Sequence, residues 1–204
     1  MSVAIITGGT SGLGASIAAQ LRERGWDVVT VSRRKSADVS GDASREETVK
    51  RAIAFAESRG TIALLVNCAG AGVFGNAGSY DEETVRRVLD ANLVSTILFC
   101  DALFTRFATE GGTIVNVLST AALLAKPKES VYSAAKWGAR GYTEVLKLEA
   151  KGTKARVMSV APGGMQTPFW PEQREGFMDP GEIARVIVDA IERPVKITEI
   201  VIER

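Results

Sequence analysis

The chain has 204 residues, of which 46% are hydrophobic, and this length and composition predict one well-filled core in a single domain, 1–204. Its 25 basic and 24 acidic residues nearly cancel, and neither sign forms a block. Broad electrostatic binding to nucleic acid or to an anionic membrane surface is therefore excluded as the expected function. We expect the partner to be a small molecule.

The absence of histidine and the presence of only two cysteines, Cys68 and Cys100, make a metal site of nitrogen and sulfur ligands unexpected. Two scattered cysteines suit reduced thiols and offer no disulfide framework. The N-terminus enters an apolar run without a basic leader, and no apolar stretch reaches the ~18 residues that a membrane helix requires. These features predict a cytoplasmic location and no contact with membranes.

Short β-rich apolar runs alternate along the chain with longer segments of helical periodicity. The predicted strands are Val3–Thr7, Asp27–Ser32, Ile62–Asn67, Thr113–Leu118, Arg156–Val160 and Thr198–Ile202. The predicted helices are Gly12–Arg24, Ser44–Arg59, Asp81–Ala108, Val131–Glu149 and Asp179–Ile191, with Ser44, Asp81 and Asp179 as candidate caps. Such βαβ alternation predicts an α/β fold, a three-layer, doubly wound, Rossmann-like parallel sheet of about six or seven strands with helices on both faces.

One predicted connection is too short for a helix with its turns. Only "RRKSADVSG" separates the strand that ends at Ser32 from Asp42. We therefore expect an abbreviated crossover, in which Ala37–Ser40 forms a brief strand without a helix before it.

A glycine-rich segment, "TGGTSGLG" at Thr7–Gly14, follows the first predicted strand and opens into a helix. Glycines let the backbone turn sharply and approach a phosphate, and the helix N-terminus adds partial positive charge. The spacing departs from the strict G-x-G-x-x-G pattern, so an ordinary glycine-rich turn is the alternative.

The end of the second predicted strand bears on the choice of nucleotide. An acidic side chain there would accept from the ribose 2′-hydroxyl of NAD, whereas arginine accommodates the 2′-phosphate of NADP. The sequence has Ser32, Arg33 and Arg34 at this point, and guanidinium groups suit a phosphate. The residues therefore favour NADP(H) over NAD(H), with a solvated basic turn as the alternative.

Tyr132 and Lys136 lie four residues apart in a segment of helical periodicity, so both side chains reach one face. An adjacent ammonium favours the phenolate and lowers the pKa of a tyrosine, which would suit Tyr132 to proton transfer. Ser119 follows a predicted strand thirteen positions earlier, where its hydroxyl could donate to a substrate oxygen. An exposed helix face and a turn serine are the alternatives.

With these residues in place, the chain resembles the short-chain dehydrogenase/reductase family over almost its whole length. The motifs stand in family order: "TGGTSGLG" for TGxxxGxG, "NCAG" at Asn67–Gly70 for NNAG, Asn92, Ser119, Tyr132 and Lys136 for YxxxK, and "PGGMQT" at Pro162–Thr167 for PGxxxT.

The resemblance implies reversible reduction of a small-molecule carbonyl to an alcohol, with Tyr132 as general acid or base. Ser119 would polarise the carbonyl, and Lys136 would hold the nicotinamide ribose and lower the tyrosine pKa. The implied cofactor-binding residues are Gly8, Thr10, Ser11, Gly12, Leu13, Gly14, Ser32, Arg33, Arg34, Asp42, Asn67, Ala69, Gly70, Tyr132, Lys136, Pro162, Gly163, Met165 and Thr167.

Two further polar residues have implied roles. Asn92 would help tether a water that relays protons to Lys136, and as a poor helix former it also suggests a local break in its predicted helix. Asp42 would meet the adenine amino group, in preference to Asp38, because the start of the next helix aligns better with Asp42.

The chain departs from the family pattern in three places. Cys68 replaces the second asparagine of NNAG, with a slight effect expected. The helix after Arg34 is missing, and the segment that forms the substrate lid in relatives is cut down to a short lid over 168–179. The apolar residues that could close over a ligand, or could equally be core or subunit-contact residues, are Phe169, Trp170, Phe177, Met178, Val73, Phe74 and Leu123.

Family members usually pair through the helix that bears the tyrosine, so we expect a homodimer or homotetramer. The small residues of that helix, which suit close helix packing or burial against its own sheet, are Ala134, Ala135, Gly138 and Ala139. The sequence does not identify the substrate or the direction of reaction. The alternative function is a catalytically inactive, NADP(H)-sensing regulatory protein of the same fold.

Overall fold

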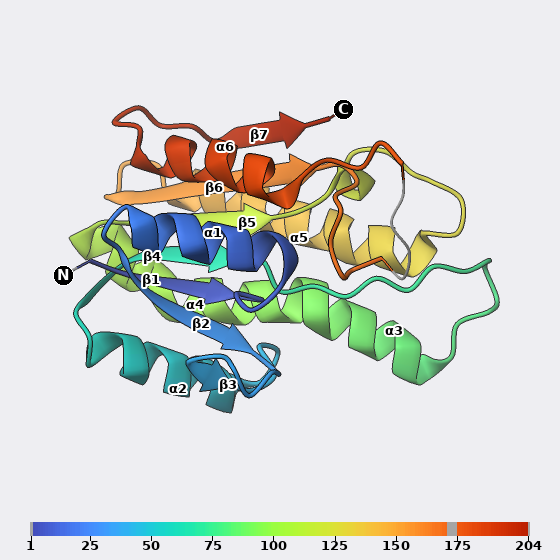
Figure 1. Cartoon of the computed structure of the whole chain (residues 1–204), viewed down its shortest axis with the longest axis horizontal. Coiled ribbons are helices and arrows are strands. Elements are labelled where there is room, and N and C mark those ends of the chain that lie inside the picture. The colour runs from blue at the N-terminus through green and yellow to red at the C-terminus, as the bar shows by residue number, and fades with distance from the viewer. Residues whose placement is uncertain (1, 171–174, 204) are drawn as a thin grey trace.

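Seven parallel strands form one sheet in the computed structural model, which describes residues 2–170 and 175–203. Their spatial order is β3-β2-β1-β4-β5-β6-β7 (Figure 1). The strands are β1 (Ser2–Thr7), β2 (Asp27–Ser32), β3 (Val39–Ser40), β4 (Thr61–Asn67), β5 (Gly112–Val117), β6 (Ala155–Pro162) and β7 (Glu199–Ile202). The predicted Rossmann-like parallel sheet is confirmed.

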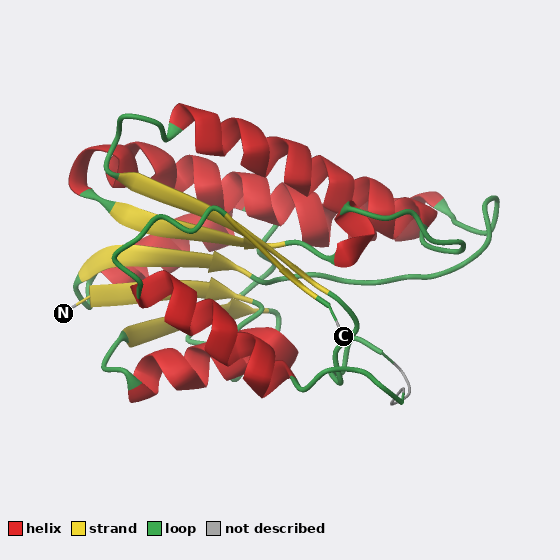
Figure 2. Cartoon of the chain, turned by 90° about the horizontal axis from the view of Figure 1, so that it is seen from above, coloured by secondary structure: helices red, strands yellow, loops and turns green. Residues whose placement is uncertain are grey.

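Helices cover both faces of this sheet (Figure 2). They are α1 (Gly12–Glu23), α2 (Glu46–Glu57), α3 (Glu82–Leu89), α4 (Ser95–Glu110), α5 (Ser130–Glu149) and α6 (Pro180–Glu192), with the π-helical segment η1 (Asp90–Val94) and the 3₁₀ helix η2 (Thr120–Ala122). α1 and α6 pack together on one face, and α2, α4 and α5 supply the core on the other.

Strand side chains alternate between two apolar cores, one on each face of the sheet. In β1, Val3 and Ile5 join the core of α2, α4 and α5, whereas Ala4 and Ile6 join the core of α1 and α6. All four residues are fully buried. A strand covered on both faces needs apolar residues at every position, which explains the continuous apolar runs in the sequence.

The predicted elements differ from the observed ones by at most two residues at either end. Asp81 and Asp179 cap α3 and α6 as expected, each accepting hydrogen bonds from N–H groups of the first turn. The expected cap at Ser44 is wrong. α2 begins later, at Glu46, and the Ser44 hydroxyl and backbone N–H both donate to Asp42.

The long helix predicted over Asp81–Ala108 is interrupted at Asn92, which confirms the expected local break. α3 passes into η1, whose wider turn carries Asn92, and α4 continues from there. The Asn92 amide nitrogen donates to the backbone carbonyls of Ala71 and Val88, at 2.7 and 2.8 Å. Single π-helical turns of this kind often occur at functional sites.

One helical stretch, Glu82–Glu110, is long and apolar enough to span a membrane by length and composition alone, with a mean hydropathy of 1.5. Its charged residues are Glu82, Glu83, Arg86, Arg87, Asp90, Asp101, Arg106 and Glu110. Its large apolar side chains face the sheet, since Phe99 and Phe107 are fully buried in the core beside α2 and α5. Packing inside the protein thus involves part of this stretch, with 39% of its most apolar window buried.

The connection between β2 and β3 contains no helix, as its length predicts. β3 has only two residues and pairs with Val31 and Ser32 at the end of β2. Within the described residues, the first part of this β2 edge therefore has no neighbouring strand. Its backbone groups need other partners, because an unpaired strand edge is unfavourable and prone to aggregation.

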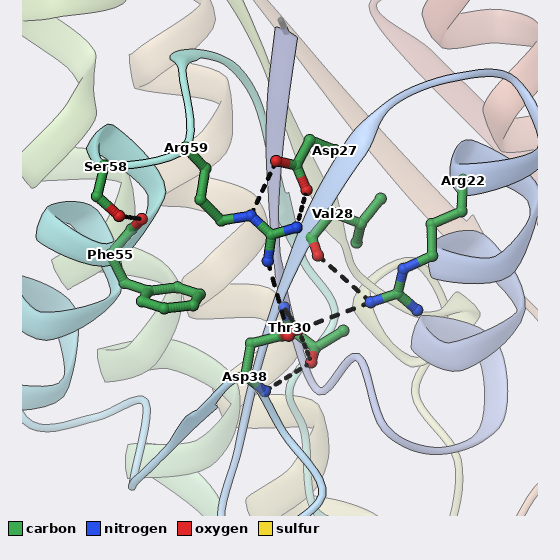
Figure 3. Close-up of polar contacts among 8 residues, drawn as sticks. All are labelled: Arg22, Asp27, Val28, Thr30, Asp38, Phe55, Ser58 and Arg59. Atoms are coloured by element: carbon green, nitrogen blue, oxygen red, sulfur yellow. Dashed lines mark hydrogen bonds and ion pairs between the residues drawn. The ribbon is translucent and has the colours of Figure 1, made fainter.

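Side chains provide these partners (Figure 3). The Asp38 carboxylate accepts from the Thr30 backbone N–H at 2.8 Å and from its hydroxyl at 2.6 Å. The Arg22 guanidinium donates to the Val28 carbonyl at 3.3 Å and lies 3.6 Å from the Asp38 carboxylate. A carboxylate and a guanidinium thus replace the missing strand.

Arg59 completes the cluster from the end of α2 (Figure 3). Its guanidinium pairs with the buried Asp27 carboxylate and lies 3.9 Å from Asp38. Burial alone would raise the pKa of Asp38, but hydrogen bonds from Thr30 and the charges of Arg22 and Arg59 outweigh burial and lower it. The Asp38 carboxylate is therefore ionised at neutral pH.

We expect Asp38→Ala to lower the free energy of unfolding by about 1–3 kcal/mol, because the buried Thr30 N–H loses its acceptor. Asp38→Asn keeps an oxygen for that N–H and should lose less. The contribution of the ionised carboxylate should be present above pH 3.8 and disappear as the pH falls through the lowered pKa. Urea denaturation of the three proteins measures this, and an Asp38→Ala variant as stable as the parent would contradict it.

Candidate active site

A cavity of about 460 Å³ opens beyond the carboxyl ends of β1, β4, β5 and β6. This is the edge of a parallel α/β sheet where ligands are generally bound. The predicted site residues that line it are Gly8, Ser11, Gly12, Leu13, Gly14, Arg34, Gly70, Asn92, Ser119, Tyr132, Lys136, Pro162, Gly163, Met165 and Thr167. The predicted residues that do not line it are Thr10, Ser32, Arg33, Asp42, Asn67 and Ala69.

The glycine loop brings backbone to the cavity wall. A side chain on Gly8, whose φ is +69°, would come within 2.9 Å of the Ala69 backbone. Gly12 also has a positive φ, +51°, and begins α1. The Ser11 side chain makes no capping hydrogen bond to α1, so that side chain leaves the N–H groups of the first turn free. This arrangement fits a phosphate group at the helix N-terminus.

The end of β2 is tied to the glycine loop. The Thr10 hydroxyl donates to the Ser32 hydroxyl at 2.8 Å, and the Arg34 backbone N–H donates to the same oxygen at 3.1 Å. Thr10 and Ser32 thus support the wall that Arg34 lines. Arg33 does not line the cavity, but its charge acts on Asp42. Burial alone would raise the pKa of Asp42, but the hydrogen bonds from Ser44 and the charges of Arg33 and Arg45 lower it.

α5 presents Tyr132 and Lys136 to the cavity as the spacing predicts. Tyr132 is 8% exposed and Lys136 5% exposed. The Lys136 ammonium donates to the Val117 carbonyl at the end of β5, at 3.0 Å, and lies 5.9 Å from the centre of the Tyr132 ring. The two residues therefore meet in one site, as expected for residues four apart on a helix.

The pKa of Tyr132 is shifted in the direction opposite to our expectation. Burial raises the pKa of Tyr132 to about 12, and a hydrogen bond with Ser119 only partly opposes it. Burial likewise lowers the pKa of Lys136 to about 8. The predicted lowering of the tyrosine pKa by Lys136 is therefore wrong, because removal of the phenolate from water is the main effect and Lys136 is not among the groups that shift this pKa.

Ser119 follows β5 and turns the chain into η2. Its side-chain oxygen accepts from the Ala121 N–H at 3.1 Å, which fixes the hydroxyl beside Tyr132. The hydroxyl proton is left to donate, either to the phenol oxygen or to a ligand oxygen.

Asn92 and Lys136 face the same point of the cavity. The Asn92 side-chain oxygen is buried, and within residues 2–170 and 175–203 it has no hydrogen-bond partner. A side chain on Gly70 would lie 2.8 Å from that oxygen and 4.0 Å from the Lys136 nitrogen. The site thus has an unused acceptor beside a buried ammonium, and the water that Asn92 would tether stays a prediction.

Asn67 does not line the cavity, but it supports the helix that carries Tyr132 through buried hydrogen bonds. Its amide nitrogen donates to the Asn116 side-chain oxygen at 2.9 Å, and the Asn116 nitrogen donates to the Thr143 hydroxyl at 2.9 Å. All three residues are buried. The chain of hydrogen bonds links β4, β5 and α5, and so it positions the helix that carries Tyr132.

An aromatic cluster closes one end of the cavity. Phe169, Trp170 and Phe177 line the wall, and Phe74 packs behind them with its ring stacked on Trp170 at 4.8 Å. Phe74 also contacts the Tyr132 ring edge-on at 5.7 Å. Of the other expected wall residues, Met178 lines an adjoining hollow, and Val73 and Leu123 line neither. In the predicted lid, 171–174 lie outside the described residues.

A second loop holds Phe74 in place. The Tyr80 hydroxyl accepts from the Gly75 N–H at 2.9 Å and donates to the Gly75 carbonyl at 2.8 Å or the Lys128 carbonyl at 3.2 Å. This contact joins the loop after β4 to the loop before α5.

Sequence reasoning missed several lining residues, among them Thr120, Lys126, Glu129 and Gly164. For Glu129 a signal existed, because a residue three positions before Tyr132 lies on the same helical face. Lys126 and Gly164 belong to loops, and their place at the cavity depends on how the loops fold.

Comparison with known proteins shows which family the chain resembles. The short chain dehydrogenase family model matches residues 2–177. "Carbonyl reductase family member 4" of Danio rerio is 30% identical over 94% of this chain and 92% of its own length. "3-oxoacyl-[acyl-carrier-protein] reductase" of Homo sapiens is 29% identical over 94% of this chain and 92% of its own length.

Solved structures agree with these relatives. The crystal structure of a short chain dehydrogenase from Burkholderia cenocepacia in complex with NADP has a TM-score of 0.89 and 29% identity. The match covers 99% of this chain and 88% of that one. The family match, the close relatives and the shared fold lead to one conclusion: this chain belongs to the short-chain dehydrogenase/reductase family of oxidoreductases.

Proposed function

We propose that the protein reduces a carbonyl compound to an alcohol with NADPH, reversibly, and that Tyr132 transfers the proton. The observation that carries the proposal is the meeting of Ser119, Tyr132 and Lys136 in the cavity that the glycine loop borders. Relatives named as reductases support the reaction class. An NADP(H)-sensing protein without catalysis would not need these three side chains together.

The residues present fit a dinucleotide. The N-terminus of α1 has first-turn N–H groups free of a side-chain cap, which could bind the pyrophosphate. Gly8 and Gly12 have positive φ and let the loop pack closely against Ala69 and Thr167. Arg34 at the end of β2 would take the 2′-phosphate, with Arg33 and Asp42 near the adenine. Pro162 and Thr167 also line the cavity, and they would face the nicotinamide part of the cofactor.

Reduction needs a hydride and a proton. A reduced nicotinamide supplies the hydride when bound. Because burial keeps the Tyr132 phenol protonated at neutral pH, the residue is in the form that donates to the carbonyl oxygen. Ser119 donates to the same oxygen and stabilises the charge that develops there. The Lys136 ammonium adds a positive field beneath the phenol and would bind the nicotinamide ribose.

The assembly and the compartment stay predictions. On α5, Ala135 and Ala139 are buried within the chain, so these small residues serve packing of the helix against its own core. Ala134 is exposed, and Trp137 on the same helix is 49% exposed. Exposed apolar residues there are the surface through which a homodimer or homotetramer would form.

We expect Tyr132→Phe to lower kcat at least a hundredfold, because the substituted ring has no proton to donate. NADPH binding should remain. NADPH consumption with a panel of ketones and aldehydes measures the first effect, and a fluorescence titration with NADPH measures the second. Tyr142→Phe, on the same helix but outside the cavity, is the matched control and should keep its activity. Undiminished turnover of Tyr132→Phe would exclude the mechanism.

We expect kcat/KM for NADPH to exceed that for NADH, and Arg33→Asp with Arg34→Ala to narrow or reverse the difference. Charged hydrogen bonds to a phosphate contribute enough to change the ratio by about 10–100-fold. Lys35→Ala, an exposed neighbour, is the control for loss of positive charge alone. Equal Michaelis constants for both cofactors in the parent would contradict the role of the arginines.

We expect Lys136→Met to abolish most activity and yet to raise the free energy of unfolding at pH 7 by about 2 kcal/mol. Burial lowers the pKa of Lys136 from 10.5 to about 8, so below pH 8 the folded protein holds a charge that the unfolded chain solvates. The parent therefore gains stability as the pH rises from 8 to 10.5, and the advantage of the variant should shrink over that range.

Urea denaturation at pH 7 and pH 10 compares the two proteins. A variant that is less stable than the parent at pH 7 would show that the hydrogen bond from Lys136 to the Val117 carbonyl outweighs the cost of burying the charge.

A further inference from the structure

Glu129 has a charge in the active-site cavity that carbonyl reduction does not explain. It lines the cavity immediately before α5, three residues before Tyr132, and is half-buried. It occupies the cap position of α5, but its carboxylate makes no capping hydrogen bond. Within residues 2–170 and 175–203, no hydrogen bond or ion pair engages that carboxylate.

The negative charge of Glu129 opposes proton release from Tyr132. Burial is the main cause of the raised pKa of Tyr132, and the negative charge of Glu129 adds to it. A carboxylate beside the phenol disfavours release of the proton that reduction requires. Because no residue of 2–170 or 175–203 pairs with this carboxylate, it is available to a positive charge that a ligand brings into the cavity.

Lys126 also lines the cavity, but it does not balance Glu129. Its side chain is exposed, and no ion pair between Lys126 and Glu129 is present in the described residues. Lys126 lies over the adjoining hollow, which carries two further carboxylates, Glu175 and Glu203. An exposed ammonium is screened by water, whereas the half-buried carboxylate acts on Tyr132 itself.

Part of the cavity wall is aromatic, and Phe169 of this part lies 5.6 Å from the Tyr132 ring centre. Phe169, Trp170 and Phe177 line the cavity, with ring centres 5.3 Å apart between Phe169 and Trp170 and between Trp170 and Phe177. Aromatic faces bind apolar groups by contact and attract cations through the ring quadrupole. A carboxylate and aromatic rings that line one cavity therefore suit a flat apolar molecule with a positive charge.

We propose that Glu129 determines specificity, and that the substrate is a carbonyl compound with a protonated amine on an aromatic or similarly flat apolar scaffold. The inference rests on the proposed carbonyl reduction and names its substrate class. The ammonium pairs with Glu129 while the carbonyl oxygen meets Ser119 and Tyr132, and the apolar scaffold lies against the aromatic wall.

Three ketones of matched size test the proposal: 4-(aminomethyl)acetophenone, 4-ethylacetophenone and 4-acetylbenzoate, which are cationic, neutral and anionic at pH 7. We expect kcat/KM with NADPH to be at least tenfold higher for the cationic ketone than for the other two. Glu129→Gln should remove that preference, because the variant has no negative charge to pair with the ammonium. Glu144→Gln, the same change on an exposed part of α5, should keep the preference.

Calorimetric binding of the three ketones in the presence of NADP+ separates the proposed carbonyl reduction from the proposed charge selection by Glu129. If none is reduced but the cationic ketone binds at least tenfold tighter, and Glu129→Gln abolishes the difference, the proposed function fails and the charge selection stands. If ketones are reduced without preference for the cationic one, or Glu129→Gln leaves its preference intact, the specificity role is overturned. Preference for the anionic ketone, lost in Lys126→Gln, would likewise overturn it.

Discussion

The parallel pairing of all seven strands is the constraint on which this molecule depends. Parallel strands point the same way, so the carboxyl ends of β1, β4, β5 and β6 meet at one edge of the sheet. The glycine loop, the NCAG turn, Ser119 and the Pro162 turn leave the sheet at that edge, and their convergence forms the cavity. Helices on both faces bury the strands, and this burial makes the edge rigid enough to hold a site.

Burial also sets the chemistry of the site. Tyr132 and Lys136 are held inside the protein by α5, and removal from water keeps the phenol neutral and makes the ammonium easier to deprotonate. The cost of placing an ammonium there is partly offset by its hydrogen bond to the Val117 carbonyl. Buried polar contacts from Asn67 through Asn116 and the π-helical turn at Asn92 supply the framework around this pair. Some stability is therefore lost where the Lys136 ammonium is buried beside Tyr132.

The shortened edge of the sheet and Arg34 of the cavity wall belong to one segment. β2 lacks a full neighbouring strand, and Asp38 and Arg22 satisfy its backbone groups. With no helix in the crossover, the chain passes from Ser32 directly into Arg33 and Arg34, and Ser32 receives the hydrogen bonds that tie this turn to the glycine loop. The chain thus keeps Arg34 at the cavity without a helix after it.

Local patterns in the sequence determined the elements, the parallel fold, the break at Asn92, the glycine loop and the one-face placement of Tyr132 and Lys136, because periodicity and spacing act between neighbours in the chain. The tertiary structure alone decided the direction of the Tyr132 pKa shift, the partners of Asp38, the supporting role of Asn67 and the aromatic wall. It also placed Glu129 in the cavity. These properties depend on burial and contact with segments far along the chain, which no local pattern records.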